Sequence, residues 1–87
     1  MGYCYISVPA RSQSFLVERR IKNEGLYCEI TYMPREIMTE LCNMGVRFDE
    51  SILINVLDVL RRSGIPSLKV FRELKYATYC QYEIIEF

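Results

Sequence analysis

Proline and glycine residues divide this chain of 87 residues into short segments, and this division limits the folds it can adopt. Pro9 follows a run of β-branched and aromatic residues, and Pro34 follows a second run of the same kind. Gly25 and Gly64 each follow a helix-like stretch. Glycine is favoured just past the end of a helix, and proline cannot donate to a sheet ladder. The breaks therefore predict an alternation of short strands and short helices.

The segments between the breaks have the order strand, helix, strand, strand, helix, strand. We predict strands over 2–8, 26–33, 44–48 and 67–71, a helix capped by Ser12 that runs to Glu24, and a helix from Asp49 or Ser51 to Ser63. Two right-handed β-α-β units in this order usually form a ferredoxin-like sandwich. The predicted fold is α+β, with one antiparallel four-stranded sheet and both helices on one face.

The C-terminal residues extend beyond this pattern. We expect a domain over residues 1–74 and an extended aromatic tail over 75–87. The tail carries the apolar residues that we single out as partner-binding candidates, which are Tyr76, Tyr79, Tyr82, Ile84 and Phe87. Because such a segment is too apolar to stay in solvent, it should add a strand to its own sheet or to the edge of a neighbour. The second helix also has a wider apolar arc than a half-buried helix requires.

Composition excludes several classes of protein. Eleven basic and eleven acidic residues leave no net charge, whereas a sequence-independent nucleic-acid binder usually has a basic excess. No apolar run reaches the roughly 20 residues of a membrane helix, and the N-terminal residues lack a signal-peptide pattern. We therefore expect a cytoplasmic protein without membrane contact, for which nucleic acid is an unfavoured partner.

The cysteines and the missing histidine limit the chemistry. Cys4, Cys28, Cys42 and Cys80 are widely spaced, and the chain contains no histidine. Zinc sites that use histidine are therefore excluded, as are Ser-His and Cys-His nucleophile pairs. Cys4 and Cys28 lie on the predicted core faces of their strands. We expect no metal, no bound cofactor and no disulfide framework, and a carrier or accessory protein rather than an enzyme.

Cys42 is the first candidate for a functional residue. It lies in a connection between two predicted strands, and Arg35 and Arg47 flank it in sequence. A nearby guanidinium would favour the thiolate, which is the reactive form of cysteine. The alternative is that Cys42 is a small buried apolar residue that packs in the core.

The sheet face opposite the helices is a second candidate surface. The predicted alternation places aromatic and cationic side chains there: Tyr3, Tyr5, Tyr27, Arg47, Lys69 and Phe71. Such a surface can stack single-stranded RNA, although the usual RNA-recognition signature is absent. Alternatively, the tail or a partner subunit covers this face.

Three motifs in sequence order resemble those of the putative Se/S carrier protein-like family, which is associated with TusA/SirA-type sulfur carriers. The family tends to have Thr-Pro-Arg-Glu-Ile/Leu and Cys-Gly-x-x-x-Arg-Phe. The matching segments here are Glu18-x-x-Ile21-Lys22-x-x-Gly25-Leu26, Met33-Pro34-Arg35-Glu36-Ile37, and Cys42 with Val46-Arg47-Phe48. The chain departs from the family at Met38-Thr39-Glu40-Leu41, where the family has serines, and at Asn43, where it has glycine.

The resemblance implies a sulfur or selenium carrier. Cys42 would hold the cargo as a persulfide or selenosulfide, Arg35 and Arg47 would support the thiolate, and protein partners would donate and accept the cargo. The alternative is a small non-catalytic adaptor that binds a larger complex through its apolar second helix and aromatic tail, or that forms a homo-oligomer.

Overall fold

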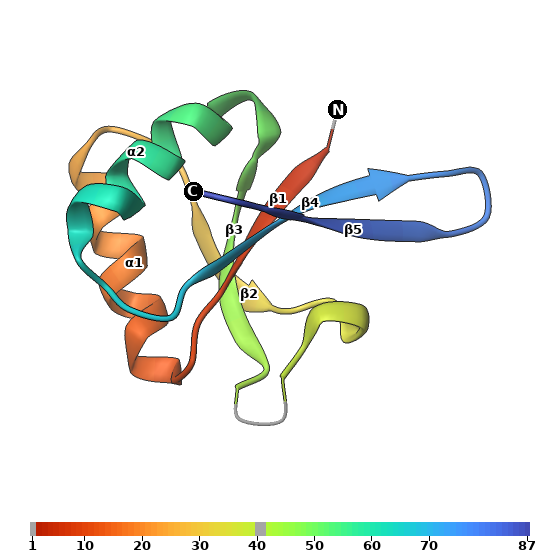
Figure 1. The fold of residues 1–87 in the computed structure, drawn as a ribbon, viewed down its shortest axis with the longest axis horizontal. Coiled ribbons are helices and arrows are strands. Elements are labelled where there is room, and N and C mark those ends of the chain that lie inside the picture. Colours follow the sequence, from red (N-terminus) through yellow and green to blue (C-terminus); the bar gives the residue numbers. More distant parts are fainter. Residues whose placement is uncertain (1, 40–41) are drawn as a thin grey trace.

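A computed structural model of the chain describes residues 2–39 and 42–87 as an α+β fold, with two α-helices packed on an antiparallel sheet (Figure 1). Two short 3-10 helices lie in the connections. In chain order the elements are β1 (Tyr3–Ser7), α1 (Arg11–Asn23), β2 (Glu29–Tyr32), η1 (Arg35–Ile37), β3 (Met44–Asp49), η2 (Glu50–Ile52), α2 (Leu53–Ser63), β4 (Lys69–Lys75) and β5 (Cys80–Ile85).

The sheet has five strands in the order β2-β3-β1-β4-β5, and neighbouring strands are antiparallel. The prediction of a four-stranded sheet is therefore wrong by one strand. The C-terminal residues form β5, which pairs with β4 from Val70↔Ile85 to Lys75↔Cys80. The side chains of this segment alternate between the two sheet faces, and the short connection between β4 and β5 lets the two strands pair as a hairpin.

Both helices contribute to one hydrophobic core. Val17 and Ile21 of α1 and Val56 of α2 are fully buried in the same cluster as side chains from one face of the sheet. The sheet residues of this cluster are Cys4, Ile6, Val46, Phe48 and Val70. The predicted arrangement of both helices against one sheet face is confirmed.

The helix ends follow local chemistry. Ala10 takes the N-cap position of α1 and makes no side-chain cap, so the predicted cap Ser12 lies inside the helix. Asp49 accepts a hydrogen bond from the Ser51 backbone N–H at 2.8 Å and begins η2, which leads into α2. Gly64 ends α2 with φ 72°, a left-handed conformation that glycine adopts without a steric penalty.

The β4–β5 hairpin extends out of the body of the protein, away from both helices (Figure 1). Tyr76 and Tyr79 lie at its tip, where their rings stack with centroids 4.8 Å apart. The backbone N–H of Tyr76 donates to the Tyr79 carbonyl at 2.9 Å. We call residues 72–83 the arm. None of the helices in the described ranges is long and apolar enough to cross a membrane.

Candidate functional site

Residues 33–43, which we call the β2–β3 connection, carry the predicted thiol. Pro34 ends β2 because it has no backbone N–H for the ladder, and the chain then forms η1. The Met33 N–H donates to the Asn43 carbonyl at 2.8 Å, which holds the two ends of the connection together. Glu40 and Leu41, where the chain departs from the family motif, lie outside the described residues.

Met33 anchors the base of the connection on the sheet. Its side chain is buried and packs on Gly45 of β3. A Cβ at Gly45 would lie 2.5 Å from the Ile6 carbonyl oxygen and closer still to the Met33 sulfur. Glycine is therefore required at position 45 for the close approach of two strands and Met33, and not for its φ angle.

Cys42 lies inside the hydrophobic core cluster, with 7% of its surface exposed. Its thiol donates to the Met44 carbonyl at 3.3 Å. Its backbone N–H donates to the Thr39 hydroxyl oxygen at 3.1 Å, and that hydroxyl donates to the Cys42 carbonyl at 3.0 Å. In this arrangement the thiol donates to a backbone carbonyl within the core cluster, so it must leave the Met44 contact before it can react.

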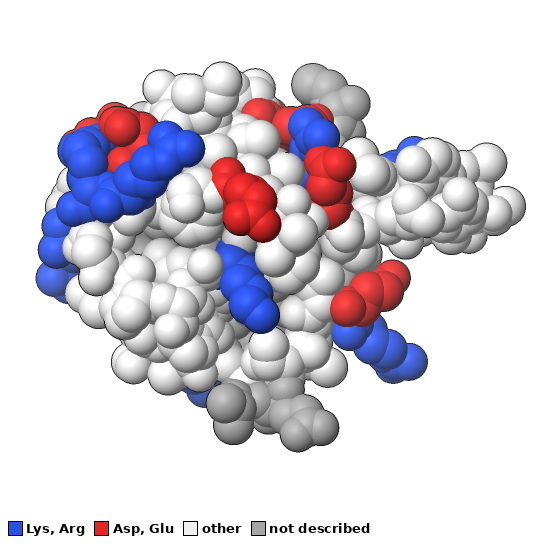
Figure 2. Space-filling model, in the orientation of Figure 1, with Lys and Arg blue, Asp and Glu red and all other residues white. Residues whose placement is uncertain are grey.

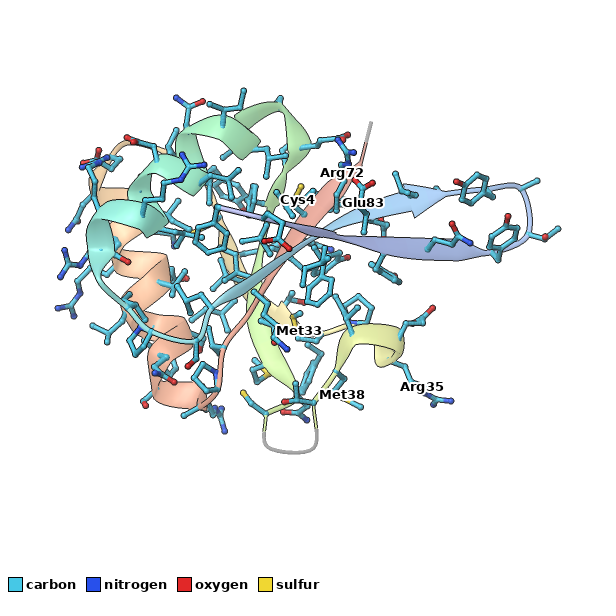
Figure 3. All side chains as sticks on the ribbon, in the orientation of Figure 1. Cys4, Met33, Arg35, Met38, Arg72 and Glu83 are labelled. Atoms are coloured by element: carbon cyan, nitrogen blue, oxygen red, sulfur yellow. The ribbon has the colours of Figure 1, made fainter. Side chains whose placement is uncertain are left out.

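Arg35 and Arg47 lie in different places from the thiol. Arg35 is exposed on η1, and Figure 3 shows its side chain pointing away from the body of the protein. Arg47 forms an ion pair with Glu29, and its guanidinium carbon lies 4.5 Å from the ring centroid of Tyr3. Within residues 2–39 and 42–87, neither arginine forms a hydrogen bond with Cys42.

A second polar cluster lies on the sheet face opposite the helices. Glu73 of β4 is buried with 9% exposure, and the Tyr82 hydroxyl donates to its Oε2 at 3.3 Å. Its Oε1 has no hydrogen-bond partner among the described residues, and Lys75 Nζ lies 3.8 Å from it. Tyr5 packs edge-on against Tyr82, with ring centroids 6.1 Å apart. We call Tyr5, Glu73 and Tyr82 the tyrosine–glutamate cluster.

Burial controls the ionisation of this cluster. Desolvation, followed by the Glu73 carboxylate, raises the pKa of both Tyr5 and Tyr82 above the usual value of tyrosine. A hydrogen bond with Arg47 offsets part of the shift in the pKa of Tyr5. Both hydroxyl groups are therefore neutral at physiological pH and serve as hydrogen-bonding groups.

The other cysteines divide by exposure. Burial raises the pKa of the Cys4 thiol to about 12 and that of Cys28 to about 11, and both side chains belong to the core. The expectation that they are core residues is confirmed. Cys80 on β5 is partly exposed. All four cysteines are free thiols, and no group of metal-binding side chains occurs in the described part of the chain.

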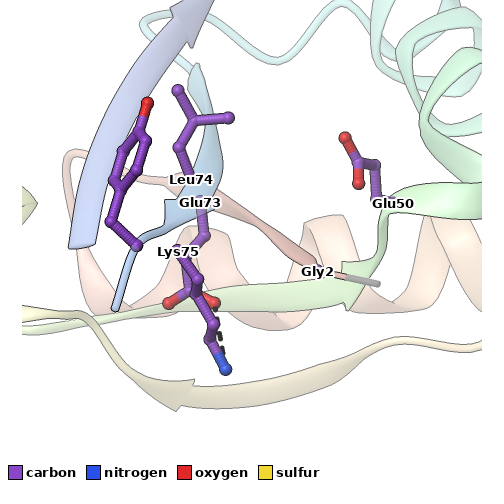
Figure 4. A pocket seen from close by; sticks show the side chains of 6 residues that line it. Gly2, Glu50, Glu73, Leu74 and Lys75 are labelled. Carbon is purple, nitrogen blue, oxygen red and sulfur yellow. Dashed lines mark ion pairs between the residues drawn. The ribbon is translucent and has the colours of Figure 1, made fainter. Parts of the chain in front are cut away.

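Two open hollows flank the arm. The first, shown in Figure 4, is lined by Gly2, Glu50, Glu73, Leu74, Lys75 and Tyr76. The second is lined by Glu36, Ile37, Leu74, Cys80, Gln81, Tyr82 and Glu83. Carboxylates outnumber cations in both hollows.

The predicted partner-binding residues are not equally available. Tyr76, Tyr79, Ile84 and Phe87 are between 40% and 54% exposed. Tyr82 instead packs within the tyrosine–glutamate cluster. Figure 2 shows the projecting end of the arm as largely uncharged on the visible face, whereas Lys and Arg side chains gather over the helices.

Sequence reasoning missed Glu73 and the structural role of Tyr82. Both depend on the pairing of β5 with β4, which places Glu73 directly opposite Tyr82. The alternation of Cys80, Tyr82 and Ile84 along one face was the available signal for a strand. It could not indicate which strand would be the neighbour.

Comparison with known proteins identifies a family. A family model described as "Putative Se/S carrier protein-like" matches residues 3–72, which include β1 to most of β4 and the whole β2–β3 connection. The resemblance inferred from the sequence motifs is thereby confirmed. No curated protein and no solved structure matches the chain. The match ends before β5.

Proposed function

The chain belongs to the putative Se/S carrier protein-like family, and from that premise we propose that it relays sulfur or selenium between proteins through Cys42. The observation that carries this proposal is the family match across the connection that holds the cysteine. In support of a ferredoxin-like carrier fold, β1 to β4 have the order β2-β3-β1-β4 within the sheet. We place the protein in the cytoplasm, where thiols stay reduced.

The transfer step needs no oxidant. The Cys42 thiolate attacks the outer sulfur of a donor protein's persulfide, the donor's S–S bond breaks, and the donor leaves as a thiolate. The new S–S bond makes Cys42 a persulfide, whose outer sulfur an acceptor thiolate removes in the same way. A selenosulfide is formed and consumed by the same exchange, with selenium as the outer atom.

The buried position of Cys42 adds a requirement to this step. The thiol donates to the Met44 carbonyl and has little exposed surface, so contact with the donor must expose it. We propose that Arg35, which is exposed on the same connection, and Arg47 then support the thiolate or its anionic cargo. Arg47 would first have to leave Glu29 and Tyr3, because these contacts lie on the sheet face away from the core cluster that contains Cys42.

Loading by a cysteine desulfurase and cysteine tests the proposal. Mass spectrometry of peptides should find the added sulfur on Cys42, and Cys42→Ser should abolish loading. Cys80→Ser is the matched control, because Cys80 is the most exposed cysteine and lies beyond the family match. A protein that loads through Cys80, or does not load where a known carrier does, would refute the role of Cys42.

An adaptor function is the second candidate, and the exposed arm favours it. Tyr76 and Tyr79 present stacked rings at the tip, with little charge around them. Rigid aromatic anchors of this kind are enriched in protein interfaces. Tyr76→Ser with Tyr79→Ser should release a bound partner while sulfur loading of Cys42 persists. Unchanged partner binding by this double variant would exclude the arm tip as the anchor.

A further inference from the structure

The outer edge of β5 has no neighbouring strand in the described part of the chain, because β5 ends the sheet order. The hydrogen-bond pattern of the hairpin shows which backbone groups face this edge. Tyr76 and Tyr79 form a hydrogen-bonded pair, and such pairs alternate along an antiparallel ladder. Gln81, Glu83 and Ile85 therefore bond to β4, and the N–H and C=O groups of Cys80, Tyr82 and Ile84 point outward.

This edge lacks the features that usually prevent pairing with another chain. Natural edge strands are blunted by proline, lysine, bulges or short length. β5 contains no proline, lysine or arginine, and its pairing with β4 is continuous over six positions. Its one charged residue, Glu83, forms an ion pair with Arg72 of the same hairpin. The opposite edge strand, β2, has four residues and is closed by Pro34. The two edges of the same sheet are thus protected very differently.

We propose that the β5 edge pairs with β5 of a second copy of this chain, antiparallel about a two-fold axis at Tyr82. In an antiparallel pair, residues directly opposite each other have their side chains on the same face of the sheet. Under two-fold symmetry this requires even-numbered residues of one copy to lie opposite even-numbered residues of the other. Centred on Tyr82, the pair places Cys80 opposite the partner's Ile84, so all three outward-facing residues bond. Centred on Glu83, it would place two glutamates directly opposite each other, which is unfavourable.

The side chains of β5 and the arm tip suit this register. Gln81 lies opposite the partner's Glu83, whose charge is already matched by Arg72 of its own hairpin (Figure 3). Tyr79, which is 54% exposed, lies opposite the partner's Ile85. Each arm tip, which projects into solvent in one copy, would therefore rest along the C-terminal end of the other (Figure 1). The exposed apolar surface of the arm would therefore be covered by the second copy of the chain.

The oligomeric state tests the proposal. Sedimentation equilibrium should show a dimer of the wild-type chain at micromolar concentration. Ile84→Pro removes an outward N–H and no hydrogen bond to β4, so this variant should sediment as a monomer and remain folded by circular dichroism. Ile54→Lys is the control, because Ile54 is 80% exposed on α2, and this variant should stay dimeric. A wild type that remains monomeric, or a dimer that only Ile54→Lys dissociates, would overturn the proposal.

The register has its own test at an exposed position. In the Gln81→Lys variant, the side chain at position 81 of each copy lies opposite Glu83 of the other, so the dimer gains two opposite-charge pairs. This should lower the dissociation constant by about 2- to 30-fold. Gln81→Glu should raise it by a similar factor, and equal constants for the two variants would refute the Tyr82-centred pairing. Sulfur loading of Cys42 tests the carrier function independently of the dimer, because the Ile84→Pro variant still contains Cys42.

Discussion

Gly45→Ala is expected to destabilise the protein although alanine is the better strand residue. Gly45 lies on β3, opposite Ser7 of β1 and Thr31 of β2, so it is in the interior of the sheet. An added Cβ would lie 2.5 Å from the Ile6 carbonyl oxygen, which cannot rotate away. The other close atom is the end of the flexible Met33 side chain. The two clashes differ in how easily they relax.

The magnitude follows from two opposing terms. Overpacking of this kind costs about 1–3 kcal/mol. Removing a strand glycine returns about 0.5–1 kcal/mol of backbone entropy. Because one clashing atom belongs to the backbone, we expect the upper part of the overpacking range and a net loss of about 1–2.5 kcal/mol. For a domain of this size, that loss lowers the melting temperature by about 4–20 °C.

Urea unfolding followed by circular dichroism measures this loss. Gly45→Ala should cost less in a Met33→Ala background than in the wild type, because the sulfur contact is then relieved while the backbone contact remains. Gly64→Ala is the control: its φ of 72° makes alanine strained, but no atom lies within 4 Å, so Met33→Ala should not alter its cost. A Gly45→Ala protein as stable as wild type would refute the reasoning.

Two further predictions concern buried polar groups. The pKa of Cys4 is raised from 9.0 to about 12 and that of Cys28 to about 11, so the unfolded chain loses these protons first as pH rises. The free energy of unfolding should therefore fall as pH rises above 9, by up to about 1.4 kcal/mol per pH unit for each thiol, until the folded pKa is reached. Urea unfolding from pH 8 to pH 10 should show a shallower decline of this free energy for Cys4→Ala than for the wild type. Tyr82→Phe removes the donor to Glu73 and should cost about 1–3 kcal/mol in the same assay, whereas Tyr79→Phe at the arm tip should stay within about 0.5 kcal/mol of wild type. A Tyr82→Phe protein with wild-type stability would show that Glu73 finds another partner.

Periodicity and breakers were enough to predict most of the elements. The strand before Pro9 and the helices ending near Gly25 and Gly64 were found because these signals act between neighbouring residues. The core face of β1 followed from alternation, since every second side chain of a strand points the same way. The order of three short motifs along the chain was enough to predict the family, and the family model confirms it over residues 3–72.

Sequence distance gave no guide to the surroundings of the candidate thiol. Cys42 and Arg47 are five positions apart, yet the thiol faces the core and the guanidinium lies over Tyr3 on the other side of the sheet. Strand pairing and side-chain alternation decide which face a residue joins, and a sequence motif contains neither.

The sequence by itself determined the local elements of this protein, its family and the absence of histidine chemistry. Tertiary structure decided that the C-terminal segment adds its strand to β4 of its own sheet, that Glu73 is buried and accepts from Tyr82, and that Cys42 donates to the Met44 carbonyl. The physical reason is range. Breakers and periodicity act over a few residues, whereas strand neighbours, burial and hydrogen-bond partners depend on which distant segments pack together.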